Sequence, residues 1–191
     1  MRYNSPMALL QHDLLIIDQI RSFLSNDFSI LDAHGRPAGY IRTEGSGLNR
    51  FFMGNRQFTV LDVDGTPMVR LDDVVTFGRD RMNIMAPNGQ PLAELVRHFS
   101  FLRSRFTITL ADGAVMEIEG KMFDREFQLA TAQMGEIARV TRSYSGIGQA
   151  LLGRERYALQ LAGFTEPWLR ATIIGCVIAI DLCRQKDKNS S

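Results

Sequence analysis

Residues Pro167 to Cys183 read PWLRATIIGCVIAIDLC, and this segment is the most informative of the chain. It is apolar on every side, and a helix of that kind has to be buried in protein or in lipid. Its continuous apolar part, Ala171 to Ile180, is shorter than the stretch of about 20 residues that spans a bilayer, and Asp181 interrupts it. We therefore expect no transmembrane span, and we predict a helix over about 166–183 that is buried within the protein.

The chain before this helix repeats one unit: an alternating apolar stretch, a polar turn with glycine, and a second apolar stretch. In one copy, Phe106, Ile108 and Leu110 alternate with threonines, which is the period of a strand with one buried face. Asp112-Gly113 then supplies turn residues that tolerate positive φ. Copies begin at Phe28, Phe58, Met82, Phe106 and, more weakly, Phe127, and their glycines are Gly35, Gly65, Gly89, Gly113 and Gly135.

Five such hairpins with flanking segments predict about ten to twelve strands, and a sheet of that size tends to curl or close. The simplest way to bury an apolar helix beside so many strands is to wrap the strands around it. We predict a mainly β fold, a closed antiparallel barrel around the C-terminal helix, as a single domain over residues 1–191. For residues 14–24 a strand is favoured over a short helix. Residues 1–8 and 185–191 are predicted to be disordered ends.

Composition limits the class of protein. Hydrophobic residues make up 45% and charged residues 23% of the chain, which is typical of a globular domain with a sizeable core. The net charge of +1 argues against a nucleic-acid partner, and an anionic membrane would have to meet a local basic patch. Cys176 and Cys183 fit core residues of a reducing compartment, and no signal peptide precedes them. We expect a cytoplasmic protein, and the excess of Arg over Lys suggests a bacterial one.

The sequence offers no set of residues for catalysis or for a resident metal. His12, His34 and His98 show no ligand spacing, and neither a phosphate loop nor a nucleophile elbow occurs. The run from Asp62 to Gly65, DVDG, resembles the start of a calcium loop but lacks the glutamate that completes one, so a hairpin turn is the better interpretation. We therefore predict a protein that is not an enzyme and that has no cofactor.

Two basic groups are candidate binding surfaces. Residues 97–106, RHFSFLRSRF, interleave Arg97, Arg103 and Arg105 with phenylalanines. Such a loop could hold a phosphate headgroup while the rings enter the interface. Alternatively, strand alternation turns the phenylalanines into the core and leaves the arginines solvated. The second group could bind anions or simply solvate a loop, and it consists of Arg139, Arg142, Arg154 and Arg156 around the segment Ser145–Gly153.

Two acidic features are interpreted as solvated. Asp72 and Asp73 are expected at a strand end in water. Asp181 is expected either to reach the barrel rim and meet solvent or to pair with an arginine, because a lone buried carboxylate is costly. The rim is favoured, since Arg184 and polar residues follow at once.

Between about Arg56 and Arg184, five segments resemble the phospholipid scramblase family, which shares its fold with tubby C-terminal domains and LURP-one-related proteins. The segments are FTVLDVDG, MNIMAPNGQPLAELV, RFTITLADGAVMEIEG and, most specifically, FQLATAQMGEIARVTRSYSG and RYALQLAGFTEPWLRATIIGCVIAID. Ser143-Tyr144-Ser145-Gly146 and Ile180-Asp181 hold two of the family's positions. The resemblance implies a barrel of about twelve strands around the helix. It also implies lipid biology, because scramblases are proposed to move phospholipids in response to calcium and tubby domains bind phosphoinositides.

The resemblance does not extend to the calcium segment. Tyr157 to Leu161 stands where the family has its aromatic-Gly-Ile-Gln-Phe stretch, and Gly153 to Arg156 precedes it with Glu155 as the single carboxylate. Calcium takes about six to eight oxygen ligands, so we do not expect a calcium site.

We expect a non-enzymatic, scramblase-like protein that binds anionic phospholipid or phosphoinositide at a membrane surface, such as the inner face of the plasma membrane. Scrambling itself is not predicted. The alternatives are a structural or protein-interaction scaffold and a transcription-associated regulator. The expected headgroup-binding residues are Arg97, Arg103, Arg105, Arg142, Arg154 and Arg156.

Overall fold

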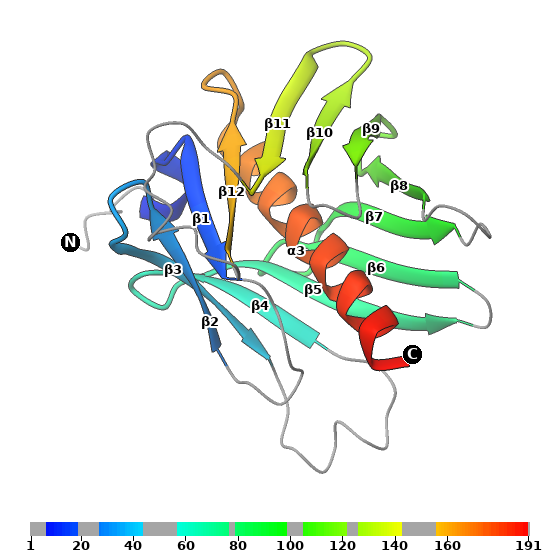
Figure 1. Ribbon diagram of the computed structural model, residues 1–191, viewed down its shortest axis with the longest axis horizontal. Coiled ribbons are helices and arrows are strands. Elements are labelled where there is room, and N and C mark those ends of the chain that lie inside the picture. Colours follow the sequence, from blue (N-terminus) through cyan, green and yellow to red (C-terminus); the bar gives the residue numbers. More distant parts are fainter. Residues whose placement is uncertain are drawn as a thin grey trace.

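The computed structural model describes residues 7–18, 27–43, 57–76, 79–98, 105–121, 126–142 and 156–190 (Figure 1). Over these residues the chain forms twelve strands, one short 3₁₀ turn and one long helix. In chain order they are η1 (Ala8–Gln11), β1 (Leu14–Asp18), β2 (Asp27–Asp32), β3 (Pro37–Thr43), β4 (Gln57–Asp62), β5 (Pro67–Thr76), β6 (Arg79–Met85), β7 (Pro91–His98), β8 (Arg105–Leu110), β9 (Val115–Lys121), β10 (Glu126–Thr131), β11 (Gly135–Thr141), β12 (Arg156–Leu161) and α3 (Pro167–Ser190).

The strands form a closed barrel in which each strand is antiparallel to the next along the chain. The barrel closes where β1 pairs with β12, with Leu15 opposite Leu159 and Ile17 opposite Tyr157. The predicted closed antiparallel barrel of about twelve strands is confirmed. The strand favoured for residues 14–24 is present at Leu14–Asp18, and the rest of that segment lies outside the described residues.

The hairpin turns repeat one geometry. In the β4–β5 turn, Asp62 N–H donates to the Thr66 carbonyl at 2.8 Å and Gly65 N–H donates to the Asp62 carbonyl at 2.9 Å. The β2–β3, β6–β7 and β8–β9 turns make the same two bonds. Gly65 has a φ of 85°, a conformation that residues with a Cβ rarely adopt, and the glycines of the other four hairpins also have positive φ. The DVDG run is therefore a turn, as predicted.

Helix α3 is buried within the barrel. All its residues from Leu169 to Cys183 are buried, and one hydrophobic core joins the apolar ones to inward side chains from all twelve strands. The helix packs most closely on β5, β6 and β7. At Gly175 a Cβ would lie 2.8 Å from a methyl of Ile84 and 2.9 Å from a methyl of Val69, so glycine permits this close approach.

The barrel has two ends that differ in what they carry. The five glycine turns lie at one end, which we call the turn end, and α3 begins there, directly after β12. The helix then runs to the opposite end, where β5 and β7 end and β6 begins, and we call this the exit end (Figure 1). None of the described helices is long and apolar enough to cross a membrane.

The helix is longer than the sequence indicated. It was expected to end near residue 183, with residues 185–191 disordered, but it continues to Ser190. Gln185 is buried, and Lys186 forms ion pairs with strand residues, so tertiary contacts hold a segment whose polarity suggested disorder. At the other terminus, Met7 and Ala8 are described and Ala8 belongs to η1, while residues 1–6 lie outside the described residues.

Candidate functional site

The topology brings four of the six predicted arginine positions to the same end of the barrel. Arg97 lies near the end of β7, Arg105 begins β8, Arg142 follows β11 and Arg156 begins β12, and all four positions are at the exit end. Only the backbone of Arg105 is described. Arg103 and Arg154 lie outside the described residues, within the segments that join β7 to β8 and β11 to β12.

Arg97 does not lie on the surface. Its side chain is 5% exposed and its guanidinium points into the barrel, where Nη1 lies 3.4 Å from a carboxylate oxygen of Asp80. The same nitrogen lies 3.5 Å from the Cys183 carbonyl, and the guanidinium carbon is 6.0 Å from the centre of the Phe106 ring. The expectation that Arg97 is an exposed headgroup ligand is therefore wrong. Phe106 does face the core, as the alternative interpretation held, but Arg97 is not solvated.

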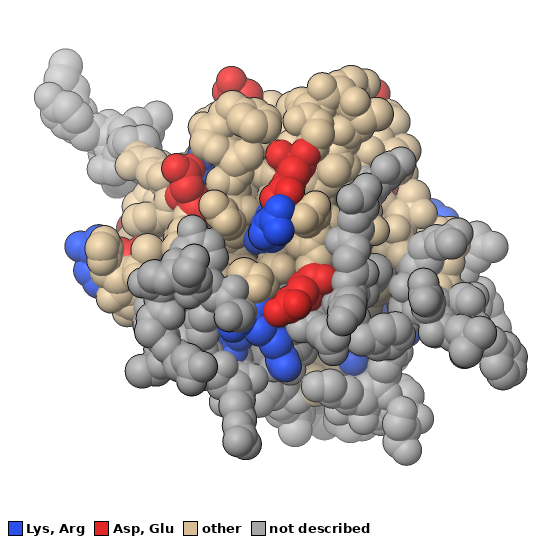
Figure 2. Space-filling model, turned by 45° about the horizontal axis from the view of Figure 1, so that its top comes forward, with Lys and Arg blue, Asp and Glu red and all other residues tan. Residues whose placement is uncertain are grey.

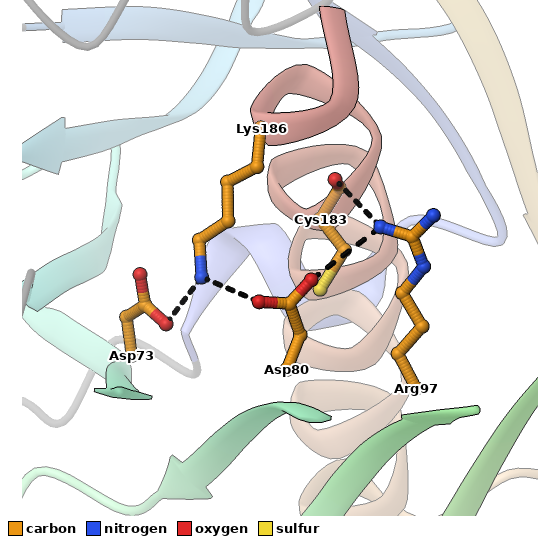
Figure 3. Close-up of polar contacts among 5 residues, drawn as sticks. All are labelled: Asp73, Asp80, Arg97, Cys183 and Lys186. Atoms are coloured by element: carbon orange, nitrogen blue, oxygen red, sulfur yellow. Dashed lines mark hydrogen bonds and ion pairs between the residues drawn. The ribbon is translucent and has the colours of Figure 1, made fainter. Parts of the chain in front are cut away.

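At the exit end, Lys186 and Arg97 share the carboxylate of Asp80 (Figure 3). Lys186 Nζ donates to Asp73 Oδ1 at 2.6 Å and to Asp80 Oδ1 at 3.2 Å. Asp73 comes from β5, Asp80 from β6 and Arg97 from β7, so the cluster ties the last turns of α3 to three neighbouring strands. We call these four side chains, with the Cys183 carbonyl, the exit-end network.

The electrostatics of the network favour its charged state. Burial opposes the charge on Lys186, but the hydrogen bond to Asp73 and the charges of Asp73 and Asp80 outweigh burial and raise the lysine pKa. Burial raises the pKa of the Cys183 thiol to about 12, and the Asp80 charge adds to this effect. The thiol is therefore protonated at neutral pH and is a poor nucleophile. The network holds two cations and two carboxylates, and its chemistry is mutual charge compensation.

This network was not predicted, although strand alternation in the sequence contains a signal for two of its members. Extending the inward positions Val69 and Leu71 of β5 by two residues reaches Asp73, which is 3% exposed and not solvated as expected. The same step from Leu95 along β7 reaches Arg97, and this strand buries every second side chain from Ala93 to Arg97. Strand alternation could not identify Lys186 of α3 as the partner of these residues.

The second predicted basic group is partly compensated by acids. Arg142 is exposed. Arg156 Nε donates to Asp18 at 2.7 Å across the β1–β12 seam, and Arg139 forms two hydrogen bonds with Glu136. In the face drawn in Figure 2, basic and acidic side chains of the described residues are interspersed. Arg142 is thus the predicted residue that the described structure offers most openly to an anion.

Two other charged residues of α3, Asp181 and Arg184, lie against the inside of the barrel. Asp181 is 2% exposed, so the expectation that it meets solvent at the rim is wrong. The guanidinium carbon of Arg184 lies 5.4 Å from the centre of the Phe127 ring of β10. Among the described residues, no group of three or more His, Cys, Asp or Glu side chains is arranged to hold a metal ion.

Comparison with known proteins places the chain in a wider group. A sequence profile of the family described as LURP-one-related matches residues 12–181. A curated relative, a phospholipid scramblase family protein of Schizosaccharomyces pombe, is 28% identical over 170 residues. The match covers 75% of this chain but 45% of the yeast protein, so the chain spans less than half of that relative. A crystal structure of an Arabidopsis thaliana protein shares the fold with a TM-score of 0.56 and 14% identity, over 90% of this chain and 92% of that one.

Proposed function

The chain belongs to the LURP-one-related family, and from this premise we propose that it binds anionic phospholipid at a membrane surface through the exit end of its barrel. The observation that carries the proposal is the convergence of the predicted arginine positions on one end of the barrel. The arginines come from two sequence regions more than 30 residues apart, and the topology brings both to the exit end. The scramblase-family relative supports a lipid as the ligand.

The exit-end network has a supporting role in this proposal. Lys186 and Arg97 are already compensated by Asp73 and Asp80, so we do not assign them to the lipid. They fix α3 against β5, β6 and β7 and so hold the rim in one shape. Headgroup contact is assigned to Arg105 and Arg142, whose positions are at the rim, and to Arg103 and Arg154, which lie outside the described residues. Arg156 is anchored by Asp18.

The protein acts in this proposal as a binding module and not as an enzyme, at the inner face of the plasma membrane. Binding depends on surface charge and weakens as salt screens it. It needs no calcium, because the acidic calcium segment of the scramblase family is replaced here by Gly153 to Arg156. Movement of lipid between leaflets is not part of the proposal.

Co-sedimentation with vesicles tests the proposal. Vesicles of phosphatidylcholine alone are compared with vesicles that also contain phosphatidylserine or a phosphoinositide, at low and moderate salt, with calcium or a chelator. We expect binding to the anionic vesicles only, weaker at moderate salt and unchanged by chelator. Loss of binding with chelator would restore the calcium site that the sequence argued against.

Two double variants locate the site. Arg103→Ala with Arg105→Ala removes the first basic group, and Arg142→Ala with Arg154→Ala removes the second. Each basic residue near an anionic surface contributes about 1 kcal/mol, so each double variant is expected to bind more than about tenfold more weakly. The matched control removes two arginines nearer the turn end, with Arg36→Ala and Arg70→Ala, and is expected to bind like the wild type.

The result that would refute the proposal is binding that all three double variants retain equally. Absence of binding to every vesicle would leave the alternative function, a protein-interaction scaffold. Exposed apolar side chains at the turn end favour binding of a protein partner there, and this does not depend on lipid binding.

A further inference from the structure

The exposed large apolar side chains of the described residues lie at the turn end of the barrel. Among the described residues, every large hydrophobic side chain that is exposed belongs to a turn or a segment at this end. Phe164, in the turn before α3, is 62% exposed, and Trp168, in the first turn of α3, is 47% exposed. The others are Met7, Val63, Val115 and Met134. Their confinement to one end of the barrel makes this end a candidate interaction surface.

The platform that carries the two aromatic residues is held in place. Arg170 is buried, and its guanidinium donates to the Thr165 carbonyl at 3.0 Å, to the carbonyls of Leu10 and His12 at 3.3 Å, and to the Asp13 carboxylate at 2.5 Å. These bonds join the start of α3 to the segment around η1. A surface that is fixed before binding loses less conformational entropy on contact.

The described charges at this end that lack an ion-pair partner include three acids. Asp64 and Asp112 are exposed in two hairpin turns, and Glu166 is exposed between Phe164 and Trp168 in the chain. None of the three acids forms an ion pair with another described residue. The nearby basic side chains are compensated, because Arg36 pairs with Asp32 and Arg139 pairs with Glu136.

We propose that the turn end is a docking surface for a protein segment that combines apolar side chains with arginine or lysine. The aromatic rings would pack against the apolar side chains of the partner, and the three uncompensated carboxylates would form ion pairs with its arginines or lysines. The same carboxylates disfavour an anionic membrane at this end. The inference stands on the turn end alone and does not depend on lipid binding at the exit end.

A natural turn of the same chain shows that two of these charges can be removed without losing the turn hydrogen bond. Asp64 Oδ1 accepts from Thr66 N–H at 2.9 Å, and Asp112 Oδ1 accepts from Ala114 N–H at 2.9 Å. In the β6–β7 turn the same place is held by Asn88, whose Oδ1 accepts from Gln90 N–H at 3.1 Å. Asp64→Asn and Asp112→Asn therefore keep the turn bond while removing the charge.

The single tryptophan of the chain makes the test direct, because Trp168 is itself part of the surface. The probe is a synthetic amphipathic peptide of leucine and arginine without aromatic residues, and the control peptide has glutamate in place of arginine. Trp168 emission is followed during titration with each peptide. We expect a blue shift with the arginine peptide, weakened by salt, and no change with the glutamate peptide.

Two sets of substitutions test the assigned chemistry. The triple variant Asp64→Asn, Asp112→Asn, Glu166→Gln is expected to bind the arginine peptide about tenfold more weakly, since exposed charge pairs contribute up to about 1 kcal/mol each. Glu126→Gln, an exposed acid at the start of β10 on the exit end, is the matched control and is expected to bind like the wild type. Phe164→Ala is expected to weaken binding while leaving the salt dependence intact.

Three outcomes would overturn the inference. They are equal binding of both peptides, unchanged affinity in the triple variant, and a Trp168 blue shift on phosphatidylcholine vesicles in the absence of peptide. The last outcome would make this end a lipid-facing surface. Because the vesicle variants change exit-end residues and these variants change turn-end residues, failure of either proposal is distinguishable from failure of the other.

Discussion

Lys186 is expected to fix the last turns of α3 at the exit end, and Lys186→Met tests this by removing the ammonium while keeping an apolar stem. Removing one member of a buried pair costs about 3–5 kcal/mol, and removing an exposed pair costs about 0–1 kcal/mol. The Asp73 side chain is 3% exposed and that of Lys186 is 23% exposed. The pair lies between these limits, and we expect unfolding in urea to show a loss of about 2 kcal/mol.

A matched control separates burial from charge. Arg81 pairs with Glu94 at 2.8 Å, a distance similar to that of the Lys186 pair, but the two side chains are 45% and 40% exposed. Arg81→Met should change stability by less than about 0.5 kcal/mol. The double variant Asp73→Asn, Lys186→Met leaves no stranded carboxylate at position 73, so its loss should be smaller than the sum of the two single losses.

The pH dependence of this contribution has a definite sign. Because the Lys186 pKa is raised above its ordinary value of 10.5 in the folded protein, the contribution is complete below that value. It is lost as pH rises through the raised pKa. Equal stability of wild type and Lys186→Met at neutral pH, or a loss no larger than that of Arg81→Met, would refute the assignment of Lys186 as the anchor of the helix.

Three further predictions concern the barrel itself. Gly175→Ala should destabilise by about 1 kcal/mol despite the better helix propensity of alanine, because the new methyl meets Ile84 at 2.8 Å; a more stable variant in urea would contradict the close packing of α3. Hydrogen bonds from Arg36 and His34 outweigh desolvation and lower the Asp32 pKa to about 2, so stability should fall as pH drops from 3.8 towards 2 and Asp32→Asn should flatten that fall. Cys183, with a pKa of about 12, should resist thiol reagents at neutral pH in the native protein and react once urea unfolds it, and rapid native labelling would show that α3 leaves the barrel.

Much of the fold follows from local patterns in the sequence. The glycine turns at Gly35, Gly65, Gly89, Gly113 and Gly135 could be predicted because positive φ demands glycine, and each has the expected backbone. The buried helix could be predicted because a helix that is apolar on all sides must be buried, and this apolar segment is too short to span a bilayer. Closure through β1 and β12 joins strands about 140 residues apart, and it was inferred from strand number and from family resemblance and not from any local signal.

The errors share one physical cause. Asp73 and Asp181 were expected in solvent, and Arg97 was expected at a lipid surface or in solvent. All three are buried, and Lys186 and Asp80 compensate two of them across elements far apart in the chain. A charge cannot be assigned to solvent or to the core until its partners are known. For the same reason the helix was predicted to end near residue 183. Its polar C-terminal residues are held by contacts that exist only in the folded barrel.

Collisional quenching of Trp168 by brominated phosphatidylserine in vesicles tests the lipid orientation most directly. From Trp168 to Lys186 the helix extends about 27 Å, at about 1.5 Å per residue, so exit-end binding keeps the turn end clear of the acyl chains. We predict that the protein sediments with these vesicles while Trp168 emission is neither shifted nor quenched. Quenched Trp168 emission in the bound protein would contradict binding through the exit end.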